Sequence, residues 1–465
     1  MRLERSDPPA PDPTAEVITL ETPELGDRSY LATDGRVGIV VDPQRDIDRV
    51  LDVAAERDVT ISHVLETHIH NDYVSGGLQL SRETGAAYLV PADEEVYFDH
   101  APIAGGESIQ AGELSIRAIH TPGHTPAHLS YLLCSGGRET AVFTGGSMLF
   151  GGVGRTDLMG EALTDGLTRA QYHSVRKLAQ ELEPTLEVHP THGFGSFCSS
   201  AEADGIPASS IGRECETNLA LAFDEENDFV ESLLSSLTAY PRYYAHMAPL
   251  NRKGPASVDL SLPKEIHAPE LRARIRAGEW IVDIRDRVAF AAAHVEGTIN
   301  VAYATLFATY LGWTIPWNTP VTLVGDSEES VAGAQRALAR IGIDRPAAQS
   351  SSGLAELAPR DEWSSYPVVS FADLASRCRQ EDVNILDVRR DDEWASGHIK
   401  SATHVPLPDL ETRMSDVPEG EVWVHCESGF RASIAASLLD RARRQPVLVN
   451  DDWDAAAKAR LDIVT

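Results

Sequence analysis

The chain has 465 residues, of which 42% are hydrophobic, so it is long enough to bury several cores without disulfides or a structural metal. It carries 40 Lys and Arg residues against 71 Asp and Glu residues, which gives a formal net charge of −31. This balance excludes the basic footprint of a nucleic-acid-binding protein, and it indicates a solvated acidic surface that opposes aggregation.

The cysteines and the distribution of apolar residues indicate the cellular compartment of the protein. The five cysteines are odd in number and lack the CxxC spacing of a zinc ribbon, so we expect neither a disulfide framework nor a structural zinc site. Met1 is not followed by a signal-peptide pattern, and no apolar run is long enough to cross a bilayer. We therefore expect a cytoplasmic protein without a nucleic-acid or membrane partner. A homo-oligomeric state is left open.

The N-terminal lead, residues 1–14, is rich in proline and charge and is expected to be disordered. The first segment with chemistry is Thr67–Tyr73, in which His68, His70 and Asp72 stand at i, i+2 and i+4. A loop that leaves the end of a strand can aim all three side chains at one point. Imidazole and carboxylate are suitable ligands for a borderline divalent metal, so the segment predicts a metal site.

Three further segments with histidine or glycine turns follow along the chain. His124 lies on a Pro-Gly turn, Thr121–Thr125, and His192 lies on a second turn, His189–Gly193. Between them an apolar strand ends in the glycine pair of Thr144–Gly146. This order of four segments resembles the metallo-β-lactamase fold, the αββα sandwich of hydrolases and dioxygenases.

Within that superfamily the first half of the chain is similar to the persulfide dioxygenases and to the glyoxalase II-like thioesterases. The resemblance rests on His68 to Asp72, on His124 and on Gly154–Asp157. It implies that His68 and His124 are ligands of one iron, and that Arg155 helps to bind the carboxylate or thiol end of the substrate. The family's third ligand is an aspartate in a Thr-Gly-Asp turn.

Two departures from this pattern change the expected site. The turn ends in Gly146, which has no side-chain ligand, and Tyr73 stands where the family has a further histidine. A dinuclear hydrolase site is therefore not expected. We expect one divalent metal, Fe(II) in preference to Zn(II), held by three imidazoles with an open position, with two further residues acting from a second shell. The imidazoles are His68, His70 and His124, and the further residues are Asp72 and His192. The alternative is a degenerate site that binds no metal.

The second strong signal lies near the C-terminus, where an apolar strand ending at His425 runs into a loop, Cys426–Arg431, and then a helix. Loop amides and the helix N-terminus favour a thiolate at such a cysteine, and then any anion attached to it. The spacing from Cys426 to Arg431 resembles the active loop of rhodanese sulfurtransferases. The resemblance implies that Cys426 carries a persulfide, that Arg431 closes the loop, and that the substrate is bound by Glu427, Ser428 and Gly429.

Upstream pieces agree with a rhodanese-like domain, namely the strand Asn384–Arg389 and the helix and turn Glu393–Ile399. The same order of pieces occurs once more, about a hundred residues earlier, as an internal repeat. No cysteine occurs in the earlier copy, which indicates an inactive rhodanese-like domain that packs against its neighbours and shapes a shared cleft. Its pieces are Trp280–Arg285, Ala293–Gly297 and Val321–Asp326.

The expected fold is α/β throughout: an αββα metallo-β-lactamase-like sandwich followed by two α/β rhodanese-like domains with parallel sheets. The predicted limits are 15–250 for the metallo-domain, 256–350 for the inactive repeat and 366–465 for the domain with Cys426. A linker through Asn251–Pro255 joins the first two, and a serine- and glycine-bearing linker joins the last two.

These resemblances imply a sulfur-handling enzyme. We expect it to oxidise a low-molecular-weight persulfide, such as glutathione persulfide, to sulfite at the metal, and to transfer sulfane sulfur through the Cys426 persulfide to give thiosulfate. Fusion of the two activities presents the cargo of one domain to the other at high effective concentration. Two alternatives stay open: a glyoxalase II-like thioester hydrolase joined to a sulfurtransferase, and a metal-free scaffold in which only Cys426 is active.

Overall fold

The computed structural model describes residues 15–199 and 207–465, so the lead of residues 1–14 lies outside the described residues. The chain divides into two compact units. The first comprises the residues up to Tyr240 together with Tyr244–Val258, and the second comprises Pro241–Tyr243 together with Asp259–Thr465. None of the helices in the described ranges is both long and apolar enough to span a membrane.

The first unit is built on two six-stranded sheets. Strands β1 to β3 of the first sheet pair antiparallel, whereas β3 to β6 pair in parallel. The first sheet follows chain order: β1 (Glu16–Thr22), β2 (Asp27–Thr33), β3 (Val37–Val41), β4 (Thr60–Leu65), β5 (Ala87–Pro91) and β6 (Ala101–Ile103). The second sheet has the order β12 (Ser209–Ser210), β11 (Glu187–Pro190), β10 (Arg138–Gly145), β9 (Leu129–Ser135), β8 (Leu114–His120) and β7 (Ser108–Ala111).

Alternating side chains explain how the second sheet serves two cores at once. Tyr131 and Leu133 of β9 join a core between the two sheets, whereas Leu132 between them joins a core on the opposite face. Strand β10 repeats this pattern, with Phe143 between the sheets and Val142 on the opposite face. Because successive side chains of a strand point to opposite faces, two buried faces require an apolar residue at nearly every position.

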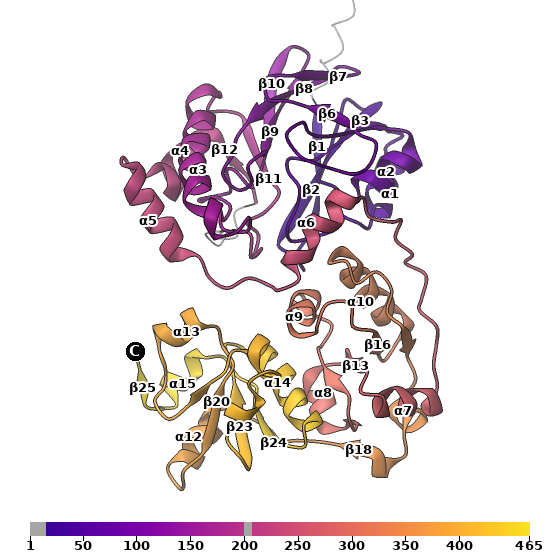
Figure 1. Cartoon of the computed structure of the whole chain (residues 1–465), viewed down its shortest axis with the longest axis vertical. Helices are drawn as coiled ribbons and strands as arrows, with labels where there is room; N and C mark the ends of the chain where they lie inside the picture. The colour runs from indigo at the N-terminus through magenta and orange to yellow at the C-terminus, as the bar shows by residue number, and fades with distance from the viewer. Residues whose placement is uncertain (1–14, 200–206) are drawn as a thin grey trace, which may run out of the picture. The chain divides into compact units, whose positions relative to one another are not determined.

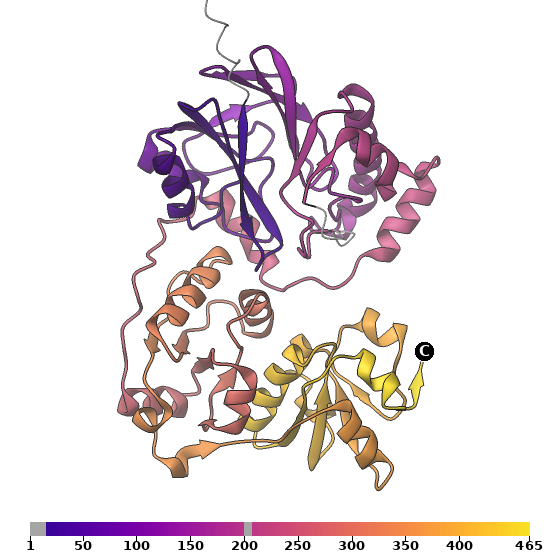
Figure 2. The ribbon, with the colours of Figure 1, turned by 180° about the vertical axis from the view of Figure 1, so that it is seen from behind.

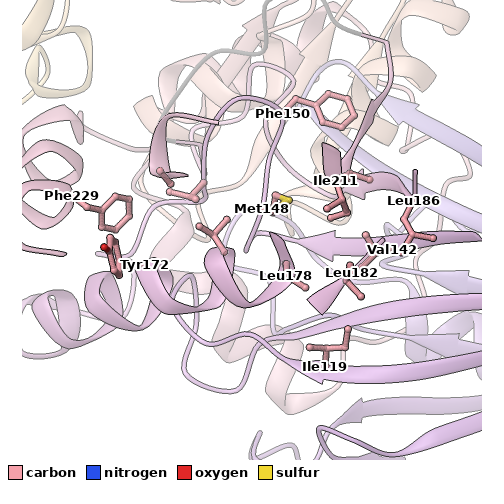
Figure 3. Packing of buried hydrophobic residues seen from close by; sticks show 14 of the residues in the cluster. Ile119, Val142, Met148, Phe150, Tyr172, Leu178, Leu182, Leu186, Ile211 and Phe229 are labelled. Atoms are coloured by element: carbon pink, nitrogen blue, oxygen red, sulfur yellow. The ribbon is translucent and has the colours of Figure 1, made fainter. Parts of the chain in front are cut away.

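Helices cover the outer face of each sheet (Figures 1 and 2). On the second sheet, α3 (Glu161–Glu181), α4 (Ile211–Thr217) and α5 (Glu226–Ser236) bury a core that Figure 3 shows around Leu178 and Val142. On the first sheet, α1 (Asp48–Glu56) and α2 (Gly77–Thr84) bury another. The four layers, helix, sheet, sheet and helix, are the αββα sandwich that the sequence predicts.

One helix of the first unit comes from beyond this sandwich in the sequence. Helix α6 (Tyr244–Lys253) adds Ala248 to the core under the first sheet. The sequence predicts a linker from Asn251 onward, but Asn251 is in this helix and only 3% of it is exposed. The packed part of the first unit therefore extends into the predicted linker.

The second unit contains two parallel sheets, each with its own hydrophobic core. The first has the order β15 (Ile299–Asn300), β13 (Trp280–Asp283), β16 (Val321–Val324) and β17 (Ala348–Ser350). The second has the order β19 (Val368–Val369), β24 (Gln445–Val449), β23 (Glu421–His425), β20 (Asn384–Asp387) and β22 (Thr403–His404). The two parallel α/β sheets agree with the fold class predicted for this half of the chain.

Candidate functional site

The segment Thr67–Tyr73 leaves the carboxyl end of β4 as a buried loop. Its anchor is Asp42, which follows β3 and has a positive φ of 50°. The backbone N–H and the hydroxyl of Thr67 each donate a hydrogen bond of 2.7 Å to the Asp42 carboxylate, and the hydroxyl of Thr191 donates a third. The neighbouring strand end therefore fixes where the loop begins.

Four imidazoles gather beside this loop. The ring centroid of His68 lies 4.1 Å from that of His70, 4.7 Å from that of His124 and 5.3 Å from that of His192. Potential metal-ligating atoms of His68, His124 and His192 all lie within 4.8 Å of one another, and so do those of His70, Asp72 and His192. The structure thus brings together the five residues that the sequence proposes around a metal, in two groups that share His192.

Two of these rings are oriented by a hydrogen bond from Nδ1. Nδ1 of His124 donates to the backbone carbonyl of Arg155 at 2.7 Å. Nδ1 of His68 lies 2.8 Å from the hydroxyl of Thr67, and that hydroxyl donates its own proton to Asp42. It therefore accepts from His68. Both rings carry their proton on Nδ1, so Nε2 keeps a free lone pair.

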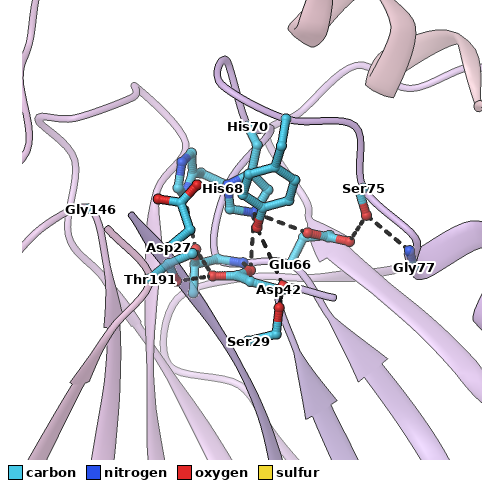
Figure 4. Close-up of polar contacts among 12 residues, drawn as sticks. Asp27, Ser29, Asp42, Glu66, His68, His70, Ser75, Gly77, Gly146 and Thr191 are labelled. Atoms are coloured by element: carbon cyan, nitrogen blue, oxygen red, sulfur yellow. Dashed lines mark hydrogen bonds and ion pairs between the residues drawn. The ribbon is translucent and has the colours of Figure 1, made fainter. Parts of the chain in front are cut away.

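Carboxylates orient the other two rings. Nδ1 of His192 lies 2.9 Å from Oδ1 of Asp27 and 3.1 Å from Oδ2 of Asp72. His70 is held through Nε2, which lies 3.2 Å from Glu66, 3.3 Å from Asp42 and 3.0 Å from the hydroxyl of Tyr73. Figure 4 shows His70 facing the two carboxylates. This leaves Nε2 of His192 and Nδ1 of His70 to face the centre.

The donor set fits a divalent metal. Among the described residues, Nε2 of His124, Nδ1 of His70 and Oδ1 of Asp72 are buried polar atoms without a hydrogen-bond partner. Such atoms are costly to bury unless an ion or a water satisfies them. Each imidazole is also held through its other nitrogen by a carboxylate, carbonyl or hydroxyl, as in metal-binding histidines generally. The four residues that could hold a metal through imidazole are therefore His68, His70, His124 and His192.

Burial and neighbouring charges set the protonation of the histidines. Burial lowers the pKa of His124 to about 3, so that ring is neutral. Burial also opposes protonation of His70, but the charge and hydrogen bond of Asp42 and the hydrogen bond of Glu66 outweigh it and raise the pKa of His70 to about 9. A metal must displace that proton to bind there.

At Gly146, where the family has an aspartate, the ring of His124 occupies the space that a side chain would need. A Cβ atom at this position would lie 2.6 Å from Cγ and 2.9 Å from Nε2 of His124. Its neighbour Gly145 has a φ of 53°, and a Cβ there would meet the ring of His128. His128, which the sequence does not single out, stacks on His68 and accepts a hydrogen bond of 3.0 Å from the backbone N–H of Gly146. Imidazoles therefore fill the space beside both glycines.

Arg155, proposed to bind substrate, is 2% exposed. Its Nε and Nη2 donate to both carboxylate oxygens of Asp157, at 2.7 and 2.8 Å. The remaining hydrogen bonds go to the backbone carbonyls of Phe197 and Thr238. In this arrangement Arg155 ties three segments together and presents its own carbonyl to His124. Its role in substrate binding stays a prediction.

The cysteine loop places the Cys426 sulfur beside a helix N-terminus. Cys426 follows β23 and is 2% exposed, and its sulfur accepts a hydrogen bond of 3.3 Å from the backbone N–H of Ala432. Ala432 lies in the first turn of the twelve-residue helix α14 (Phe430–Arg441). The sulfur therefore lies at the positive end of a helix dipole.

The other predicted loop residues have distinct places. Glu427 and Ser428 are exposed and Gly429 is buried. Gly429 has a φ of 83°, and a Cβ there would lie 3.1 Å from Cα of Asn450, so only glycine fits without strain. Arg431 makes a bidentate pair with the carboxylate of Glu393 at 2.5 and 2.6 Å, which closes the loop against its own domain.

The earlier repeat shares two sets of hydrogen bonds with the domain that carries Cys426. The N–H of Ile284 donates to the carbonyl of Val324, as the N–H of Val388 donates to that of His425. In addition, each strand ends in an aspartate that forms a bidentate pair with the arginine two residues later, Asp283 with Arg285 and Asp387 with Arg389. Each arginine also donates to the backbone carbonyl eight residues further on. This register places Gly325 at the position of Cys426. The repeat therefore has the frame of the domain that carries Cys426, without its thiol.

Comparisons with known proteins agree with this division. The model of the metallo-beta-lactamase superfamily matches residues 24–192, and the model of the rhodanese-like domain matches residues 267–355 and 370–459. The probable polyketide biosynthesis zinc-dependent hydrolase BaeB of Bacillus velezensis is 31% identical over 162 residues, which are 34% of this chain and 68% of that protein. The mitochondrial persulfide dioxygenase ETHE1 of Homo sapiens is 27% identical over 214 residues, 44% of this chain and 79% of that protein.

Among solved structures, a metallo-beta-lactamase from Staphylococcus aureus superposes with a TM-score of 0.64 at 27% identity, over 72% of this chain and 98% of that one. The superposed part is longer than residues 24–192, which the model of the metallo-beta-lactamase superfamily matches. With the αββα sandwich, the histidine centre and the two rhodanese-like frames in place, the chain belongs to the metallo-beta-lactamase superfamily and carries two rhodanese-like domains behind its metallo-beta-lactamase domain.

Proposed function

We propose that the protein oxidises a low-molecular-weight persulfide, such as glutathione persulfide, to sulfite at one metal ion, and that Cys426 transfers sulfane sulfur. The observation that carries this proposal is the pairing in one chain of a centre of four oriented imidazoles with a cysteine at a helix N-terminus. Similarity to a persulfide dioxygenase supports the first activity, and the two rhodanese-like matches support the second.

In the first half of the reaction, the histidines of the first unit hold the metal ion, and their hydrogen-bond partners orient the rings. His68, His124 and His192 offer Nε2, and His70 offers Nδ1, each from a ring whose other nitrogen is fixed. When bound there, a redox-active metal such as Fe(II) supplies the electron transfer to dioxygen that persulfide oxidation requires. The buried carboxylates Asp27 and Asp42 keep the rings in place and balance the charge of a cation.

In the second half, the thiolate of Cys426 attacks the outer sulfur of a donor persulfide. The sulfur–sulfur bond of the donor breaks, the donor thiolate leaves, and Cys426 becomes a persulfide. Sulfite then attacks that outer sulfur, the sulfur–sulfur bond to Cys426 breaks, and thiosulfate leaves while the thiolate is regenerated. The helix N-terminus stabilises the anion that departs. The reverse transfer uses the same groups. A cytoplasmic location is part of the proposal, because a reducing compartment suits such a thiol.

A second candidate is hydrolysis of a thioester at Zn(II), with the same sulfurtransferase behind it. It is favoured by the similarity to a zinc-dependent hydrolase and by the imidazole ligands, which suit zinc as well as iron. The absence of a side-chain ligand at Gly146 and the presence of Tyr73 count against a dinuclear form of it. In the third alternative, the first unit binds no metal and only Cys426 turns over.

The deciding experiment measures metal content in protein purified without oxygen, together with dioxygen consumption on glutathione persulfide in the same sample. Near-stoichiometric iron with dioxygen uptake supports the proposal. Zinc without uptake moves the assignment to hydrolysis, and no metal leaves Cys426 as the active centre. His124→Ala serves as the matched variant, because it should abolish uptake while sulfur transfer from thiosulfate to cyanide continues.

A further inference from the structure

One buried side chain joins helix α6 to the metal loop. Nδ2 of Asn251 donates hydrogen bonds to the backbone carbonyls of His70, at 3.0 Å, and Tyr73, at 2.9 Å. Its Oδ1 accepts a hydrogen bond of 2.9 Å from the backbone N–H of Ser75. These partners lie 176 to 181 positions earlier in the chain. Asn251 also lies beyond the matched superfamily residues 24–192.

The chemistry of this contact is specific to an amide. The stretch from His70 to Ser75 is buried and belongs to no helix, and it lies outside the strands apart from a bridge at Ser75, so most of its backbone groups cannot pair within regular structure. Unpaired backbone groups at such a place are costly. A side-chain amide offers two N–H donors and an acceptor at once. Aspartate has the same shape but no donor, and alanine has neither function.

The contacts bracket the residues that face the metal centre. The two carbonyls belong to His70 and Tyr73, and Asp72 lies between them. The carboxylate of Asp72 lies 3.1 Å from Nδ1 of His192, and it carries an unpartnered buried oxygen. Fixing the backbone on both sides of Asp72 therefore fixes the direction of its carboxylate and of the His70 ring.

The segment that carries Asn251 is itself clamped to the first unit. The N–H of Tyr97 donates to the carbonyl of Arg252 at 2.8 Å, and Arg252 pairs with Glu94 at 3.1 Å. Further along, Nη2 of Arg45 donates to the carbonyl of Ala256 at 3.0 Å. These contacts hold the helix in one position on the loop.

We propose that Asn251 is a positioning residue of the metal site, which pre-organises the segment from His70 to Ser75 for metal binding. The inference rests on the proposed metal centre and makes α6 a part of it. Residues that hold metal ligands from behind typically change metal affinity by roughly 10–100-fold when they are removed. The loss expected for Asn251 is of that size.

The test measures Zn²⁺ affinity of the full chain by competition with a chelator, in Asn251→Ala and Asn251→Asp. Both variants should bind zinc roughly 10–100-fold more weakly than the wild type. Asp keeps the volume and the acceptor of Asn, so a role in packing alone predicts wild-type affinity for Asn251→Asp, and that result would overturn the proposal. Asn300→Ala is the matched control, because Asn300 is a buried amide that donates to two backbone carbonyls in the inactive repeat. It should leave zinc affinity unchanged.

Hydrogen exchange on the wild type without added metal tests the contact itself, even if a variant does not fold. The bond from the Ser75 N–H to Asn251 predicts slow exchange of that amide before any metal is added. Fast exchange there would overturn the proposal. If the wild type and both variants bind no zinc while the Ser75 amide is protected, the proposed metal centre fails and the positioning contact stands.

Discussion

Nε2 of His192 lies 3.3 Å from Nε2 of His68, although the two residues are 124 positions apart in the sequence. Each ring is held through Nδ1. Burial opposes protonation of His192, but the charges of Asp72 and Asp27 outweigh it and hold the pKa of His192 well above its usual value. Nε2 of His192 therefore carries a proton and donates it to Nε2 of His68, and a metal bound between the two rings must displace that proton. The arrangement makes His192 a direct candidate ligand, in addition to the second-shell role that the sequence suggests.

Replacing His192 by alanine tests that assignment. Because the change removes an imidazole nitrogen from the centre, metal affinity should fall by more than the roughly 10–100-fold that an outer partner costs. Metal content after purification and chelator competition measure the loss. His173→Ala is the control, since its side chain is 68% exposed on α3 and should change nothing. Full metal loading in His192→Ala would remove it from the ligand set.

The sequence predicts the fold of this protein better than its metal site. The αββα order and the two rhodanese-like frames are implied by the resemblance of ordered motifs to known families, and those motifs are local signals. The residues that orient the imidazoles, such as Asp27 and Asp42, stand at strand ends far from the histidines they hold. Only Asp42 carries a hint in the sequence, because it directly follows the apolar strand Val37–Val41, and parallel strands place polar residues of a site at their carboxyl ends.

Asn251 shows where sequence reasoning must fail. Its neighbours, a basic pair followed by glycine and proline, are typical of a linker, and the pattern predicts one. Nothing local records that its amide meets carbonyls of a loop near residue 70. Likewise Gly146 looks like a lost ligand in the sequence, whereas the structure shows the ring of His124 in the space that a side chain would need.

Gly146→Asp tests whether the family's carboxylate can simply be restored. We expect that it cannot, because the new Cβ would displace the ring of His124. Metal affinity should fall by roughly 10-fold or more, as it does when ligand orientation is disturbed. Gly166→Asp is the control, since a Cβ there meets no atom within 4 Å. Tighter metal binding in Gly146→Asp would show that the turn can repack around the added carboxylate.

Cys426→Ser should abolish sulfur transfer, because a hydroxyl cannot form a persulfide at the helix N-terminus. Dioxygen uptake on glutathione persulfide should continue, since the metal residues all lie in the first unit. Transfer of sulfur from thiosulfate to cyanide reports the loss. Cys378→Ser, at an exposed thiol on α12 (Phe371–Cys378), is the control. Residual transfer in Cys426→Ser at the wild-type rate would place the sulfur carrier elsewhere.

His425, next to that cysteine, makes the stability of the second unit depend on pH. Its ring is buried, stacks on Trp453, and has no hydrogen-bond partner at either nitrogen among the described residues. Burial lowers the pKa of His425 to about 4, although Asp387 opposes the shift. In the unfolded chain a histidine has a pKa of about 6.5.

Between pH 6.5 and 4 the unfolded state therefore takes up a proton that the folded state does not, so stability is lost as the pH falls through this window. His425→Phe keeps an aromatic ring without a titrating group. Between pH 6.5 and 4 its free energy of unfolding should therefore fall by about 3 kcal/mol less than that of the wild type. All seven tryptophans lie between residues 280 and 453, so urea unfolding followed by their fluorescence reports on the second unit alone. Above pH 7 the difference between the two proteins should no longer change with pH, and equal losses on acidification would show that His425 is not buried as a neutral ring.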